Sequence, residues 1–242
     1  MLKRLFPEMY DRPEKGMAVA VILYGFIAFI LMPVVVVLLG MDVWTDRGAL
    51  AWVEVVYHVF NGCIAAAMFK SYLGESFYNV QLFTEKFLTT VAIASLIMLT
   101  IALELQFAQG LITANAYPIN ELPITMVSGI MVQNLPVWGT VCHTIAAPFA
   151  VACLYYATGF APWSCKKPWL GYLIVPIALI IPIVLDINWR GGADYKFFVY
   201  FLQLPIHLVA CWAYQKADTI WAPITCLAIF NLGTSLISLL PI

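Results

Sequence analysis

Long runs of apolar residues, separated by short polar stretches, dominate the chain. A membrane-spanning helix needs about 20 mostly apolar residues to cross about 30 Å of hydrocarbon, and seven segments meet this requirement. They are residues 17–40, 49–69, 87–108, 137–161, 168–186, 195–214 and 219–240. The runs do not alternate apolar and polar residues as the strands of a membrane β-barrel do. The pattern therefore predicts an all-α, polytopic transmembrane helix bundle that forms a single domain over residues 1–242.

Two segments fall outside this regular pattern. Residues 110–136 contain Pro118, Pro123, Gly129 and Pro136 among apolar residues, and non-helical backbone cannot face lipid. We therefore expect a loop there, followed by a short interfacial or re-entrant helix at about 121–133. The polar residues 1–16 precede an apolar run that is longer than the 7–15 residues typical of a signal peptide. They are expected to form a cytoplasmic N-terminal segment.

The placement of Lys and Arg predicts the orientation, because cytoplasmic loops carry an excess of both. With a cytoplasmic N-terminus, the inside segments and connecting loops hold nine basic residues: Lys3, Arg4, Arg12, Lys15, Lys70, Lys86, Lys166, Lys167 and Lys216. The outside segments hold three: Arg47, Arg190 and Lys196. The excess of nine over three supports both this orientation and the number of spans.

Composition narrows the class of protein further. Hydrophobic residues make up 63% of the chain and charged residues 10%, whereas soluble domains are about half apolar and about a quarter charged. A soluble globular protein and a disordered chain are both excluded. The net charge of -1 leaves no basic excess for nucleic acid, and no glycine-rich nucleotide-binding motif occurs. The lipid bilayer is the expected partner, and the compact loops favour a bacterial cytoplasmic membrane.

Ionisable residues inside the predicted spans are functional candidates, because each costs about 2.5–3.5 kcal/mol at the centre of a membrane helix. Glu54, His58 and Asn61 lie at positions i, i+4 and i+7 of the second span, which places them on one helix face. Three groups from other spans lie at a similar depth in the expected topology: Glu104, His143 and Asp186. Side chains from several helices are thus expected to approach one another in the outer half of the membrane.

Glu54, His58 and His143 are the candidate catalytic and metal-binding residues. Imidazole nitrogen and carboxylate oxygen suit zinc, so zinc is the expected cofactor if these three side chains converge. Glu54 would then act as a ligand or as a general base toward water, with the histidines as ligands or acid partners. The E-x-x-x-H spacing is weaker evidence for a zinc site than the H-E-x-x-H pattern would be. The same groups also suit a proton or substrate pathway, or hydrogen bonds that hold the bundle together.

A second polar group lies near the C-terminal end of the chain. Gln203 and His207 form another i, i+4 pair on the sixth span, and Pro205 between them frees a backbone carbonyl. Asn231 lies in the middle of the seventh span. A buried Asn needs hydrogen-bond partners, so we expect Asn231 to pair with His207 or Gln203.

Residues 140–240 resemble the CPBP family, the CAAX-protease and bacteriocin-processing (Abi) intramembrane peptidases. The segment Ala217-Asp218-Thr219-Ile220-Trp221-Ala222-Pro223-Ile224 is similar to the family's T-G-S-I-W-A-P-I pattern, which precedes a helix bearing H-x-x-x-N. Ala147-Pro148-Phe149 resembles the A-P-I that precedes the family's E-E-x-x-x-R helix. In active members the resemblance implies a glutamate and histidines that activate water against a peptide bond.

The catalytic positions of the family are not kept. The paired glutamates fall on Val151 and Ala152, the arginine on Tyr156, and the final histidine on Leu227, whereas the asparagine is kept as Asn231. The resemblance therefore implies a degenerate member that lacks the standard peptidase mechanism. The cavity in which active relatives bind substrate would here be lined by four residues: Tyr156, Gln203, His207 and Asn231.

Three functions remain open on the sequence. The favoured one is a catalytically silent protein that binds a hydrophobic peptide or a partner helix, in bacteriocin immunity or in peptide processing and export. The second is an active intramembrane peptidase with a relocated site at Glu54, His58 and His143. The third is a small transporter or a transporter's membrane subunit, in which prolines break the helices near a binding site.

Overall fold

The computed structural model describes residues 47–113, 133–164, 167–185 and 193–237, together with Phe26, Ile30, Leu31, Val34 and Leu38. Every element within these ranges is helical, as the hydrophobic pattern predicts. The elements are α5 (Arg47–Met68), α6 (Lys70–Leu82), α7 (Thr84–Thr113), α9 (Val137–Ala152), the π-helix η3 (Cys153–Phe160), α10 (Ala161–Ser164), α11 (Pro168–Leu185), α12 (Ala193–Ala217) and α13 (Trp221–Ile237).

Three helical segments of the described chain are long and apolar enough to cross a membrane: Ala51–Met68, Thr84–Glu104 and Val137–Ser164. The apolar helical stretches Pro168–Ile180 and Trp221–Ile237 are shorter. Large apolar side chains on the outside of α7, such as Leu96 at 66% exposed, match a lipid environment better than water. The chain is a helical membrane protein.

Three of the sequence predictions lie mainly or wholly outside the described residues. The first predicted span, residues 17–40, is represented by five described residues only, and all five have exposed side chains. Of the predicted interfacial or re-entrant helix at 121–133, only residue 133 is described. No residue of the predicted N-terminal segment 1–16 is described.

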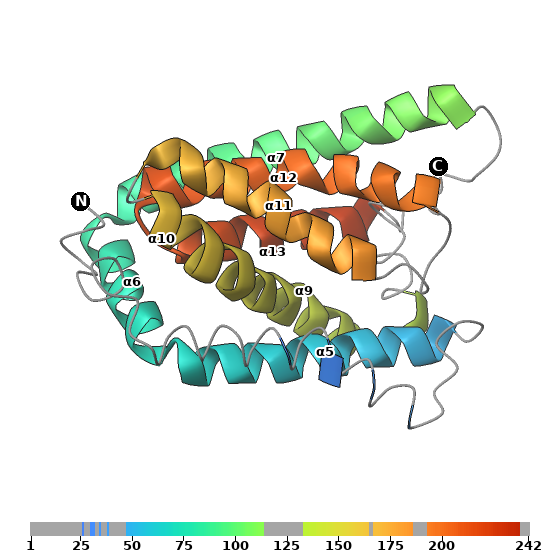
Figure 1. The fold of residues 1–242 in the computed structure, drawn as a ribbon, viewed down its shortest axis with the longest axis horizontal. Helices are drawn as coiled ribbons and strands as arrows, with labels where there is room; N and C mark the ends of the chain where they lie inside the picture. The colour runs from blue at the N-terminus through green and yellow to red at the C-terminus, as the bar shows by residue number, and fades with distance from the viewer. Residues whose placement is uncertain are drawn as a thin grey trace.

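The helices cross one another in a bundle in which α9 and α13 lie between α5 on one side and α7 on the other (Figure 1). Helix α5 packs along α9 in the same direction, since Trp52 contacts Trp138 and His58 contacts His143. Helix α13 likewise runs in the same direction as α7, with Cys226 near Val91 and Gly233 near Leu99. The shared directions place matching depths of α5 and α9 side by side.

Helix α6 is a feature that the sequence pattern did not predict, because residues 70–86 were expected to be a connecting loop. It lies at one end of the bundle (Figure 1). Ser76 is hydrogen-bonded to Thr219 through their hydroxyls at 2.8 Å, and it accepts the Ile220 backbone N–H at 2.9 Å. The Trp221 indole donates to the Leu73 carbonyl at 3.1 Å. Helix α6 is thereby attached to the turn between α12 and α13.

The predicted span 137–161 is two kinds of helix in the structure. An α-helical part ends at Ala152 and the wider η3 follows, in which Tyr155 and Tyr156 are both buried. Pro162 lies just beyond η3, and a proline ring collides with the carbonyl four residues earlier unless the helix widens or bends. The widening brings two consecutive tyrosines into the core.

Candidate metal centre

Helix α5 supplies two of the three candidate ligands. Glu54 and His58 are one turn apart, so their side chains lie on the same face of the helix. The Glu54 Oε2 and His58 Nε2 atoms are 3.3 Å apart. Their side chains are only 18% and 16% exposed, respectively, so solvent screens this pair less than it would at a surface.

Helix α9 supplies the third candidate ligand, His143. Helices α5 and α9 lie side by side here: a Cβ placed on Gly62 would make ordinary van der Waals contacts, at 3.6 Å from the Phe149 ring and 3.9 Å from the Ala146 carbonyl oxygen. His143 lies at the level of His58, and the two ring centroids are 5.3 Å apart in an edge-to-face arrangement.

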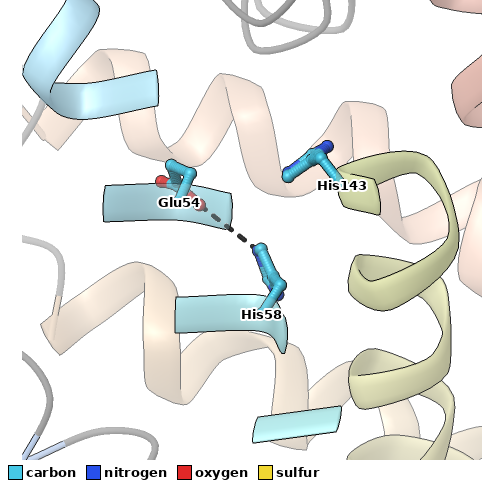
Figure 2. A group of neighbouring side chains, drawn as sticks. All are labelled: Glu54, His58 and His143. Atoms are coloured by element: carbon cyan, nitrogen blue, oxygen red, sulfur yellow. Dashed lines mark ion pairs between the residues drawn. The ribbon is translucent and has the colours of Figure 1, made fainter. Parts of the chain in front are cut away.

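The three side chains face one another across the α5–α9 contact (Figure 2). One ligand atom from each of Glu54, His58 and His143 lies within 4.8 Å of the others. Ligands bound to zinc at about 2.0–2.2 Å would be roughly 3–4 Å apart, so modest side-chain rotations would bring all three into range. Two histidines and one carboxylate also form a known set for catalytic zinc, which leaves the fourth position for water.

Of the other carboxylates predicted at this depth, the structure describes Glu104, which is not part of the group. Glu104 is exposed on α7, and Asp186 lies outside the described residues. Tyr57, which the sequence analysis did not single out, is next to the group: its ring centroid is 5.0 Å from that of His58. Its position three residues after Glu54 was the signal that could have found it.

The polar residues of the C-terminal half that are predicted to line a cavity differ in how deeply they are buried. The Tyr156 hydroxyl is hydrogen-bonded to Nδ1 of His207 at 2.6 Å, and both side chains are buried. Gln203 is exposed, and the Asn231 side chain is partly buried. Tyr156 engages Nδ1 of His207, and the pairing of Asn231 with His207 or Gln203 stays a prediction.

The positions at which the CPBP resemblance places catalytic groups form part of the apolar core. Ala152 is fully buried and Leu227 is 6% exposed, and Val151 packs against the same cluster. Comparison of the chain with family models, with curated proteins and with solved structures finds no match. The class that the fold and the side-chain group define is a helical membrane protein with a candidate metal centre between two helices.

Proposed function

We propose that this chain is a metal-dependent hydrolase that acts on peptide bonds within the membrane, with Glu54, His58 and His143 as its centre. The observation that carries the proposal is the approach of three ligand atoms to within 4.8 Å of one another. A bound zinc ion would polarise a carbonyl and lower the pKa of water. His58 and His143 would hold the ion as neutral imidazoles, and Glu54 would complete the ligand set or accept a proton from water.

The proposal includes the finer topology, with seven spans and a cytoplasmic N-terminus in a bacterial membrane. Support comes from the basic residues: Lys70 begins α6, Lys86 acts on Asp218 electrostatically, and Lys216 is in the last turn of α12. All three are therefore close to the end of the bundle formed by α6. In this orientation the centre lies in the outer half of the membrane.

A second candidate function is the binding of a hydrophobic peptide or partner helix. In this case the chain would be a catalytically silent relative of the CPBP peptidases. The observation that favours it is the apolar filling of the family's catalytic positions, where Ala152 is fully buried and Leu227 nearly so. The hydrogen bond between Tyr156 and His207 occupies the same region. In this alternative the group around Glu54 would only join two helices. A small transporter remains a third proposal, without a structural observation that favours it.

Metal content and hydrolysis, measured separately, test the proposal. Purified protein should bind about one zinc per chain, and Glu54→Gln should weaken zinc binding by at least about a hundredfold, because even indirect contacts to a metal ligand are worth tenfold to a hundredfold. The same variant should abolish cleavage of a hydrophobic fluorogenic peptide in proteoliposomes. Glu104→Gln is the matched control, since it removes an exposed carboxylate outside the group; it should preserve both properties.

The two readouts separate the candidates. Zinc binding without any peptide cleavage would refute the hydrolase and leave a structural metal in the silent protein. Cleavage that survives Glu54→Gln would refute the assignment of the centre. Absence of both zinc binding and cleavage in wild-type protein would favour the silent binding protein.

A further inference from the structure

Asn61 is a buried polar residue with an unusual deficit of hydrogen bonds. Its side chain is 2% exposed, and neither its amide nitrogen nor its carbonyl oxygen has a hydrogen-bond partner among the described residues. Such groups are rare in folded proteins, because an unpaired buried donor or acceptor destabilises the fold. When they persist, a water or a ligand commonly completes them.

The position of Asn61 connects it to the candidate metal centre. It follows His58 by three residues and Glu54 by seven, so it lies on the same face of α5, one turn further along. The next residue, Gly62, contacts α9 at Phe149 and Ala146. The Nδ1 atom of His58 is also buried without a hydrogen-bond partner in the described part of the chain. Polar side-chain atoms without a hydrogen-bond partner in the described chain therefore occur both at the metal centre, on His58, and one turn further along α5, on Asn61.

The chemistry of a carboxamide selects one kind of group to fill this deficit. An Asn side chain offers a donor at Nδ2 and an acceptor at Oδ1. A peptide unit offers the matching acceptor and donor, so the two can pair through two hydrogen bonds. An ester has no N–H and would leave Oδ1 of Asn61 unpaired. A phosphate or carboxylate also offers acceptors only, and it would add a charge that is costly to bury.

We infer that Asn61 is a substrate-binding residue that pairs with the backbone amide of an unwound peptide next to the metal centre. The inference rests on the proposed function and names its substrate class as a peptide rather than an ester or a lipid phosphate. A membrane helix must unwind before one of its peptide bonds can be attacked, and its freed N–H and C=O groups then lack partners in lipid. Asn61 supplies one of each.

The first experiment measures stability without any substrate. Asn61→Leu removes both unpaired polar atoms at similar size, so it should raise the melting temperature in detergent by about 2–4 °C. Asn79→Leu is the matched control: Asn79 is 4% exposed, but its amide donates to the Asp218 carbonyl at 3.1 Å, so this change should lower the melting temperature. A lower melting temperature for Asn61→Leu would overturn the inference, since it would show that Asn61 is already paired.

The second experiment measures peptide binding. The probe is a fluorescent hydrophobic peptide with a central Gly-Gly pair, which favours unwinding, and its analogue with an ester in place of the Gly-Gly amide. Wild-type protein should bind the amide about tenfold more tightly than the ester, because the ester leaves a buried group unpaired. Asn61→Leu should bind both peptides equally. Equal binding by the wild type, or a preference that survives in Asn61→Leu, would overturn the inference.

Measurements of zinc binding and of peptide cleavage distinguish a failure of this inference from a failure of the proposed function. Asn61→Leu should retain its zinc, whereas loss of zinc would show that Asn61 supports the metal through water and does not bind the peptide. Binding that distinguishes amide from ester in a protein that cleaves neither would support the peptide site while refuting the hydrolase.

Discussion

At the scale of single residues, Asp218 shows how the turn between α12 and α13 is built. It follows the last residue of α12 with φ at 59°, a left-handed conformation that Gly adopts freely and other residues adopt at a cost. Burial raises the pKa of its carboxyl group, and the Lys86 ammonium opposes that rise. The backbone carbonyl of Asp218 accepts a hydrogen bond from the Asn79 amide at 3.1 Å, which connects the turn to α6.

We predict that Asp218→Gly is more stable than Asp218→Ala by about 1 kcal/mol, since only Gly relieves the left-handed backbone. Thermal unfolding in detergent measures the difference. Equal stability of the two variants would contradict the role of the backbone conformation.

The contribution of the Asp218 carboxyl group to stability should depend on pH. Because the pKa of Asp218 is higher in the folded protein than its ordinary value of 3.8, this carboxyl favours folding most below that value and loses its contribution as the pH rises through the folded pKa. The stability gained by Asp218→Gly relative to wild type, measured by thermal unfolding, should therefore be larger at pH 7 than at pH 4. A gain that is larger at pH 4 would contradict the direction of the shift.

At the scale of elements, close contacts between helices depend on particular small residues. A Cβ placed on Gly171 of α11 would lie 2.7 Å from the Phe160 ring and 3.0 Å from the Phe160 carbonyl oxygen. Phe160 is fully buried at the end of η3, so it has little room to move. The contact between α11 and η3 therefore requires glycine.

We predict that Gly171→Ala lowers stability by about 1–3 kcal/mol, the usual cost of an added methyl group in a packed interface. Gly74→Ala is the matched control, because nothing lies within 4 Å of a Cβ at that exposed position of α6. It should raise stability by up to about 1 kcal/mol through the better helix propensity of Ala. Thermal unfolding of both variants in one detergent tests the pair, and a neutral Gly171→Ala would contradict the contact.

A short repeat also marks equivalent places on two helices. V-A-C-x-x-Y occurs at 151–156 and again at 209–214. Both cysteines are fully buried, and both tyrosines are nearly or fully so. Each tyrosine hydroxyl bonds to another helix: Tyr156 to His207, and Tyr214 to Tyr72 at 2.5 Å. The repeat was a signal for these interhelical bonds, although its spacing does not identify their partners.

At the scale of the whole molecule, the proposed orientation predicts which side of the membrane each end of the bundle faces. Lys216 is exposed near the α6 end, and Gln133 is exposed before α9 begins. In intact cells, an impermeant maleimide should label Gln133→Cys and should leave Lys216→Cys unlabelled until the membrane is opened. Wild-type protein, whose exposed Cys63 and Cys142 lie within helices, measures the background. The reverse pattern would refute a cytoplasmic N-terminus.

The W-A-P-I segment has structural contacts at the start of α13. Trp221 begins α13 and bonds to α6, and Pro223 lies in the first helical turn, where a missing N–H costs little. These are structural roles in the attachment of α6.

The sequence by itself determined the helical membrane class, because hydrophobic runs of sufficient length must form helices to satisfy their backbone in lipid. It also placed Glu54, His58 and Asn61 on one face, since helix geometry relates residues three, four and seven apart. Only the tertiary structure decided that His143 joins Glu54 and His58, that His207 bonds to Tyr156, and that Asn61 lacks a partner in the described chain. Those results depend on the register and direction of helix packing, which no local pattern along the chain encodes.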